Sequence, residues 1–146
     1  MKFLATGNIR DPKGPKKIIV FAYTFFLVFI LLNLLLEVLN TPLNKDEFFN
    51  SIETSLIIRL EKGHIQIFLF GFLLVFYFST LIYAKFEDQR KEKVIIFTIF
   101  CFVLYIFSLI YYQISDWYYY FYWISTFLFH ITLLVLQIFL YRDIKS

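Results

Sequence analysis

The chain has few of the residues from which soluble enzymes build catalytic and cofactor-binding motifs. Its 146 residues include 4 Gly, 3 Pro and 1 Cys. So few glycines do not form a phosphate-binding loop, and no Walker motif, Gly-x-Ser-x-Gly motif or zinc-type spacing occurs. The single Cys101 excludes an intramolecular disulfide and a cysteine metal cluster. The sequence therefore favours a non-enzymatic protein, and we predict no metal site.

Apolar residues, in contrast, are abundant. Hydrophobic residues make up 60% of the chain and aromatic residues 23%. A soluble domain of this size cannot bury so much apolar surface, so the composition indicates that lipid covers it. About 20 residues of helix cross a hydrocarbon core of about 30 Å. Runs of about this length predict transmembrane helices at residues 18–39, 64–84, 94–113 and 118–141. The first run exceeds the apolar region of a signal peptide, and we interpret it as an uncleaved anchor.

The predicted fold is all-α: an integral membrane, up-down bundle of four transmembrane helices. Short connections force neighbouring helices to run antiparallel, which favours this topology. We expect one transmembrane domain, 18–141, between cytoplasmic tails at 1–17 and 142–146.

The first long connection carries a helical pattern of its own. Asn44 begins a capping pattern, and apolar residues then recur at spacings of mostly four. These residues are Phe48, Phe49, Ile52, Leu56 and Leu60. The pattern predicts an amphipathic interfacial helix over 45–60, with a bend at Gly63 before the second membrane helix.

The distribution of basic residues predicts the orientation. Eleven of the 14 Lys and Arg lie in the two tails and the 85–93 connection. The positive-inside rule then places both termini in the cytoplasm of a multipass protein, which we assign to a bacterial inner membrane. The net charge of +3 is explained by this topology, and no nucleic-acid partner is predicted.

Aromatic side chains crowd the turn before the last helix. They are Tyr111, Tyr112, Trp117, Tyr118, Tyr119, Tyr120, Tyr122 and Trp123. Rings with a polar tip favour the headgroup layer, so we interpret this group as a belt at the outer interface. The alternative is an aromatic cage or a quinone site, which requires a polar anchor.

Polar side chains inside the apolar runs are the most specific chemical signal, because lipid offers them no hydrogen bonds. One stripe on the third helix consists of Thr98, Cys101, Tyr105, Ser108 and Tyr112. A second stripe on the fourth helix consists of Thr126, His130 and Gln137. We expect the two stripes to meet. His130, near the bilayer midplane, is expected to be neutral and hydrogen-bonded by Tyr105, Ser108 or a similar partner. It either serves packing or acts on haem, a metal or a proton.

A second set of polar residues lies near the outer helix ends. Asn33, Glu37, Glu61, His64 and Asp116 either line an outward-facing vestibule or form a solvated rim. His64 lies about ten residues nearer the surface than His130, roughly 15 Å along a helix, so the two do not ligate one haem. Glu61 and His64 have the Glu-x-x-His spacing of di-iron bundles, but one such pair at the surface does not make that site.

Small size, missing catalytic motifs and the polar stripes favour an accessory or assembly subunit. Such a subunit associates with other membrane subunits, or with copies of itself, through polar helix faces. Two alternatives remain open: a haem- or quinone-binding redox component that uses His130, and a small oligomeric transporter or channel. Membrane lipid is a further expected partner, and no cofactor is predicted for the accessory role.

Overall fold

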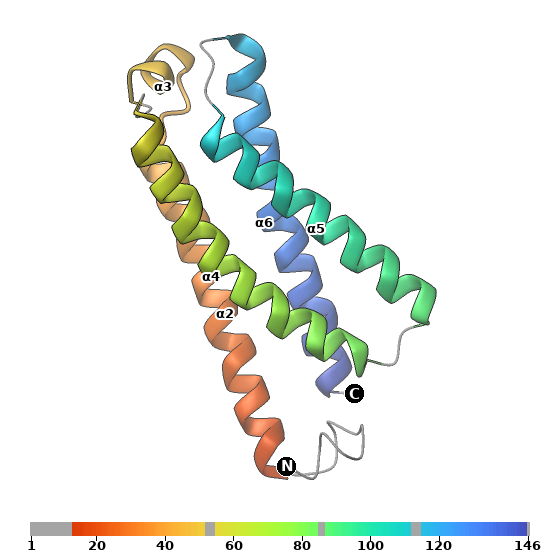
Figure 1. Cartoon of the computed structure of the whole chain (residues 1–146). Helices are drawn as coiled ribbons and strands as arrows, with labels where there is room; N and C mark the ends of the chain where they lie inside the picture. Colours follow the sequence, from red (N-terminus) through yellow and green to blue (C-terminus); the bar gives the residue numbers. More distant parts are fainter. Residues whose placement is uncertain (1–12, 52–54, 85–86, 112–114, 146) are drawn as a thin grey trace.

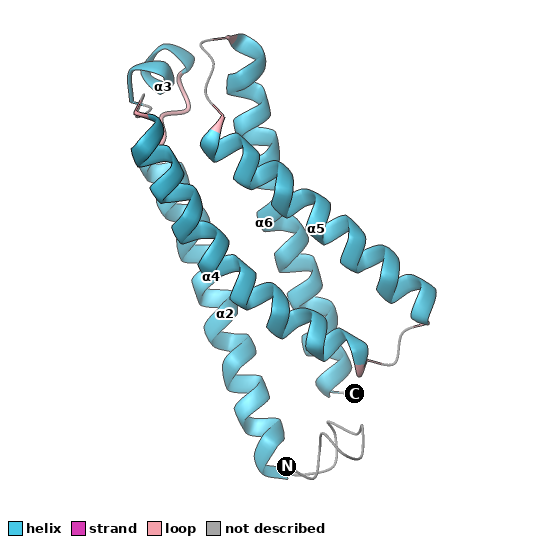
Figure 2. Cartoon of the chain, in the orientation of Figure 1, coloured by secondary structure: helices cyan, strands magenta, loops and turns pink. Residues whose placement is uncertain are grey.

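The computed structural model describes residues 13–51, 55–84, 87–111 and 115–145, and every regular element in these ranges is a helix. Four helices are long and apolar enough to cross a membrane. They are α2 (Lys13–Asn40), α4 (Leu56–Ile82), α5 (Asp88–Ile110) and α6 (Asp116–Lys145), and a short α3 (Lys45–Ser51) follows α2 (Figures 1 and 2). The prediction of an all-α protein with four helices of membrane length is therefore confirmed.

Helix α6 is the centre of the structure. It contacts α5, α2, α4 and α3, while α4 also packs against α5. In Figure 1 the start of α2, the end of α4, the start of α5 and the end of α6 lie at one end of the molecule. We call this the terminal end, and we call the opposite end, where α3 lies, the α3 end.

Helix α2 lies at the periphery. Its buried side chains include Tyr23, Ile30 and Glu37, which are seven residues apart and so return to one narrow face every two turns. Most of its other apolar side chains are exposed, among them Phe21 and Leu39. Such a surface fits lipid rather than water.

The helices begin and end a few residues from the predicted limits. Helix α2 starts at Lys13, inside the predicted tail 1–17, of which residues 1–12 lie outside the described ranges. Pro15 fits there, because the N–H groups of a first helical turn have no intrahelical partner. Helix α6 extends through most of the predicted tail 142–146.

The predicted interfacial helix over 45–60 is wrong in its extent. Helix α3 ends at Ser51, residues 52–54 are not described, and α4 begins at Leu56. The apolar residues from Leu56 to Leu60 therefore belong to a membrane-length helix, and their side chains are largely exposed on it.

The prediction that the second membrane helix begins after a bend at Gly63 is also wrong. Gly63 lies inside the continuous helix α4. A Cβ at this position would lie 2.9 Å from Cγ1 of Ile110 on α5. The glycine therefore allows α4 and α5 to approach closely.

Helix α3 is held against the start of α6. The Asn44 side chain accepts the N–H of Asp46 at 3.0 Å and caps α3, as the sequence predicts. Phe48 is fully buried, with its ring centroid 5.1 Å from Tyr119. Lys45 forms an ion pair with Asp116, and this hydrogen bond raises the pKa of Lys45 above its ordinary value. Both apolar and ionic contacts thus fix α3 at this end.

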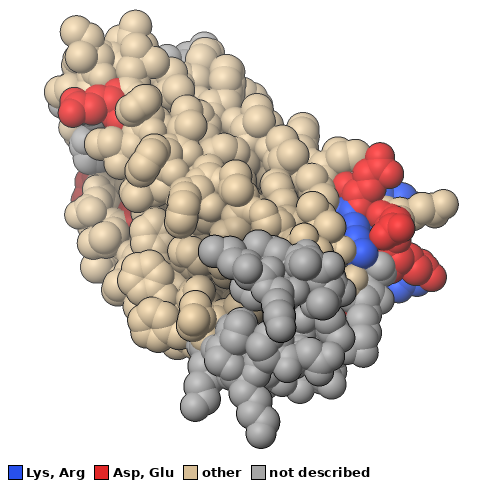
Figure 3. All heavy atoms as spheres, turned by 60° about the horizontal axis from the view of Figure 1, so that its bottom comes forward, with Lys and Arg blue, Asp and Glu red and all other residues tan. Residues whose placement is uncertain are grey.

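Charged side chains gather at the ends of the helices. Figure 3 looks toward the terminal end and shows Lys, Arg, Asp and Glu together beside the start of α5, with little charge on the visible flanks. Apolar residues such as Phe68, Phe72 and Ile124 are more than 60% exposed on the helix sides. This is the distribution that a lipid-covered bundle requires.

Candidate functional site

The two predicted polar stripes face each other inside the bundle. Their described members on α5 and α6 are all buried. The Tyr105 and His130 rings pack edge to face with centroids 5.5 Å apart, and the Thr132 hydroxyl lies 3.8 Å from Sγ of Cys101. The prediction that the stripes meet is confirmed for Tyr105 and His130, whereas Thr132 was not part of the predicted stripe and Tyr112 lies outside the described ranges.

His130 is fully buried near the middle of α6, but its hydrogen-bond partners are neither Tyr105 nor Ser108. Its Nδ1 lies 2.8 Å from the Thr126 carbonyl, and its Nε2 lies 3.0 Å from the side-chain amide of Asn33 on α2. Tyr105 contacts the histidine through its ring, and the Ser108 hydroxyl donates to the Tyr105 carbonyl instead. The sequence could not show that α2 supplies the partner, because nothing in it fixes the rotation of α2 against α6.

The charge of His130 is linked to the orientation of Asn33. A carbonyl only accepts, so Nδ1 must carry a proton. A neutral ring then accepts at Nε2, which requires Asn33 to present its NH₂ group. If Asn33 presents its amide oxygen, the ring must be protonated on both nitrogens. Oxygen and nitrogen of an amide are assigned from hydrogen bonding, so both arrangements fit this position.

Glu37 places a carboxylate inside the bundle, one turn from Asn33 toward the α3 end. It accepts a hydrogen bond from the Tyr122 hydroxyl of α6. Lys62 of α4 reaches the same oxygen, with Nζ 3.2 Å from Oε1. The Glu37 side chain is 7% exposed and that of Lys62 is 48% exposed. A buried anion is thus covered by a cation that reaches in from the surface.

These residues form one connected unit. Tyr122 bonds Glu37, Nε2 of His130 lies 3.0 Å from the Asn33 amide one turn away, and the Tyr105 ring packs against the His130 ring. We call this unit the Glu37 cluster. Its members are Asn33, Glu37, Lys62, Tyr105, Tyr122, Thr126 and His130.

Several polar atoms in and beside the Glu37 cluster have no hydrogen-bond partner within the described protein. They are the Tyr105 hydroxyl, the Thr126 hydroxyl, the Trp123 indole N–H and the Gln66 side-chain oxygen. All four side chains are at least nine-tenths buried. Buried polar groups are nearly always paired, so this concentration marks a region with unused capacity to bind a polar group.

Three residues of the predicted vestibule lie elsewhere. The buried face of α4 includes Gly63, Gln66 and Phe70, and Glu61 and His64 fall outside this face and are exposed. Asp116 is paired with Lys45 at the surface. Of the predicted set, the structure brings only Asn33 and Glu37 into the Glu37 cluster.

The aromatic belt is divided between the surface and the core. Trp117 and Tyr120 are about 60% exposed, as a belt requires, whereas Tyr118, Tyr122 and Trp123 are buried. The buried rings lie in the first turns of α6, where Tyr122 contacts Glu37. These three side chains therefore pack inside the bundle, while the position of the aromatic group at the outer interface stays a prediction.

Gln137 belongs to a separate network nearer the terminal end. Its side chain accepts from the Tyr77 hydroxyl and donates to the Tyr23 carbonyl, and the Tyr23 hydroxyl lies 2.6 Å from that of Thr80. We call these four residues the Gln137 cluster. No side-chain polar atom of these residues is left unpaired within the described chain. Such a satisfied network stabilises the packing of three helices.

An apolar layer separates the two clusters. Ile30 on α2, Phe70 and Leu73 on α4, and Leu133 on α6 are all buried between them. Gln137 lies seven residues beyond His130 on α6, roughly 10 Å along the helix. The described part of the chain therefore holds no continuous polar path from one end to the other.

Lys62 was in no predicted site, and Tyr122 was predicted only as a member of the aromatic group before the last helix. Tyr122 continues the spacing of four from Thr126 and His130, so extending the stripe by one turn would have included it. Lys62 carried no such signal, because its role depends on how α4 is rotated.

Comparison with known proteins adds no assignment. No protein family, curated protein or solved structure matches this chain. Among the described residues, no group of three or more His, Cys, Asp or Glu side chains is placed to hold a metal ion. A functional conclusion therefore depends on the geometry of the Glu37 cluster.

Proposed function

We propose that this is a non-enzymatic membrane-spanning protein that binds a small organic cation at Glu37. The observation that supports the proposal is the pairing of a buried carboxylate with a half-exposed, tethered ammonium group. A charge buried in a membrane bundle is costly and marks a functional site more often than a structural one. Lys62 already demonstrates that an ammonium group fits against this oxygen.

The surroundings of Glu37 suit a cation that also has an organic surface. The Tyr122 ring lies 5.7 Å from Trp123, 5.3 Å from Phe48 and 6.3 Å from Tyr118 between centroids. Aromatic faces attract ammonium groups, and cages of such rings are a recurring solution for organic cations. The carboxylate supplies the charge, and the rings supply apolar and cation–π contacts.

The unpaired polar atoms favour a ligand with hydrogen-bond donors. A primary ammonium carries three donors, and the hydroxyls of Tyr105 and Thr126 are both able to accept. Trp123 contributes a donor for a polar group elsewhere on the ligand. In this proposal the incoming ammonium replaces the Lys62 ammonium, and Lys62 moves out to the solvent.

We further propose that the four long helices form an up-down bundle with both termini in the cytoplasm and α3 at the outer interface. The excess of Lys and Arg in the terminal segments supports this orientation. The Glu37 cluster would then open toward the outer side, and the ligand would enter past Lys62.

Other roles have less support from the contacts. An accessory subunit remains a proposal, but the polar stripes that favoured association are packed inside the chain. A haem ligated by Nε2 of His130 would have to displace the hydrogen bond to Asn33. Transport would have to open the apolar layer between the two clusters. We therefore favour binding at a one-sided site.

The proposal is tested by fluorescence of Trp123. The chain has two tryptophans, so Trp117→Phe leaves Trp123 as a reporter beside Tyr122. Titration of the purified variant with methylammonium chloride should give a saturable change that sodium chloride at equal ionic strength does not give. Glu37→Gln should abolish it, whereas Asp116→Asn, at an exposed acid of the same end, should not. A response that survives Glu37→Gln, or no saturable response, would contradict the proposal.

A further inference from the structure

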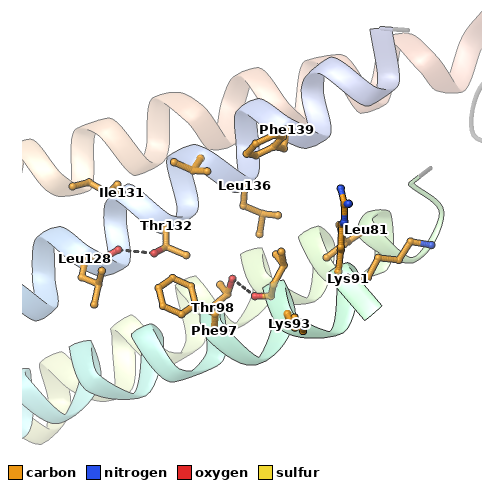
Figure 4. Close-up of a pocket in the computed structure, with 13 residues that line it drawn as sticks. Leu81, Lys91, Lys93, Phe97, Thr98, Leu128, Ile131, Thr132, Leu136 and Phe139 are labelled. Atoms are coloured by element: carbon orange, nitrogen blue, oxygen red, sulfur yellow. Dashed lines mark hydrogen bonds between the residues drawn. The ribbon is translucent and has the colours of Figure 1, made fainter. Parts of the chain in front are cut away.

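A groove runs between α5 and α6 at the terminal end, away from the Glu37 cluster. It has a volume of about 620 Å³, and most of its lining is apolar side chains from the two helices. Figure 4 shows Phe97 on one side, Leu128, Leu136 and Phe139 on the other, and lysines at one end. The lining threonines, Thr98 and Thr132, donate to carbonyl groups of their own helices. The body of the groove therefore presents an apolar surface.

One end of the groove is basic. Arg90, Lys91 and Lys93, all in the first turns of α5, contribute to the lining, and no acidic residue does. Lys91 also bonds the Ile82 carbonyl and Asp88, which ties it to the end of α4. Arg90 and Lys93 are exposed, and Nε of Arg90 lies 2.9 Å from Oε2 of the equally exposed Glu87. Exposed ion pairs of this kind are weak, and no acidic side chain lines the groove itself, so the lining at this end is basic.

The length of the groove matches one leaflet of a membrane. Its lining on α5 extends from Arg90 to Thr98, and on α6 from Phe139 to Leu128. At 1.5 Å per residue these spans measure roughly 12 and 16 Å, and half of a hydrocarbon core is about 15 Å. The basic end therefore lies where headgroups lie, and the apolar part lies where acyl chains lie.

We propose that this groove is a binding site for an anionic phospholipid of the leaflet at the terminal end. Its acyl chain occupies the apolar part between α5 and α6, and its phosphate lies against Arg90 and Lys93. Two observations favour a lipid over a partner helix: the basic side chains at one end of the groove complement a phosphate, and the length of the groove matches a single leaflet. A partner helix would cover the apolar part of the groove without contacting the basic side chains. The inference is independent of cation binding at Glu37.

Native mass spectrometry of the detergent-solubilised protein tests the headgroup. The protein is mixed with equal amounts of phosphatidylglycerol and phosphatidylcholine that have matched acyl chains. Each basic residue near the headgroup is worth about fivefold in affinity, so phosphatidylglycerol should be favoured roughly 5- to 30-fold. Arg90→Gln with Lys93→Gln should bring the preference close to one. Arg142→Gln removes an exposed charge that does not line the groove and should leave the preference unchanged.

A second pair of variants tests the apolar part. Val135 and Ile138 are both exposed on α6, but only Val135 lines the groove. Val135→Trp should reduce binding of both lipids, and Ile138→Trp should not. Ile131→Trp fills the same groove and replaces Val135→Trp if that variant does not purify. Equal binding of the two lipids by the wild-type protein, or loss of preference in Arg142→Gln, would overturn the proposal. So would full binding in the groove-filling variants.

Discussion

Removing the ammonium group of Lys62 should destabilise the protein only while Glu37 carries its carboxylate. Lys62→Met removes the charge and keeps the apolar stem. Over the 3.2 Å between Nζ and Oε1, Coulomb's law at an effective dielectric constant of about 20 gives about 5 kcal/mol. Lys62 is half exposed, so solvent screens part of this attraction. Exposed pairs couple by about 0.2–1 kcal/mol, whereas loss of one partner from a buried pair costs about 3–5 kcal/mol. We expect a coupling of about 1–3 kcal/mol.

A double-mutant cycle isolates this value. The free energy of unfolding is measured for the wild type, Lys62→Met, Glu37→Gln and the double variant in mixed micelles, and the coupling energy is the departure from additivity. Lys45→Met and Asp116→Asn form the matched control, because that pair lies at the same end and is more exposed. Its coupling should be smaller, since solvent and salt screen it more strongly. A Lys62–Glu37 coupling energy no larger than that of the control pair would refute the conclusion that the Lys62 ammonium covers a buried Glu37 carboxylate.

Two further predictions concern the fold. Asn50→Cys on α3 should react with a membrane-impermeant maleimide in intact cells, whereas Gln89→Cys on α5 should react only after permeabilisation. Cys101 is buried and should stay unlabelled in both experiments. The reverse labelling pattern would contradict the proposed orientation. Gly63→Leu should lower the free energy of unfolding by about 1–3 kcal/mol, because the added side chain separates α4 from α5. Gly71→Leu should leave the free energy of unfolding unchanged, because a Cβ there meets nothing within 4 Å. Equal effects of the two variants would show that the close approach of α4 and α5 does not contribute to stability.

The membrane helices were predictable because hydrophobic length is a property of the chain alone. The number and order of the four helices, the cap at Asn44 and the buried stripe through Tyr105 all follow from composition or from spacings of three and four. The helix limits were less accurate near Gly63. Glycine signals either a bend or a close approach, and only the position of Ile110 on another helix distinguishes the two.

The site was predictable only in its inner part. Thr126 and His130 share a face by spacing, so their burial on α6 could be expected. Glu37 joins them because α2 packs against α6 with one narrow face, and sequence spacing within α2 does not fix that rotation. Lys62 and Tyr122 were not assigned to this site because an interfacial lysine or tyrosine ordinarily faces water or headgroups, and the bundle turns these two toward a buried charge.

Cation binding at Glu37 is the central claim, and the affinity of the Lys62→Met variant for methylammonium tests it most directly. The measurement uses Trp123 fluorescence in the Trp117→Phe background, with Lys45→Met as the control. If Lys62 is a tethered competitor with a coupling of at least about 1 kcal/mol, its removal should tighten methylammonium binding at least about fivefold. The control should bind as the parent does. Unchanged or weaker binding by Lys62→Met would show that the Lys62–Glu37 pair is structural and would contradict the account.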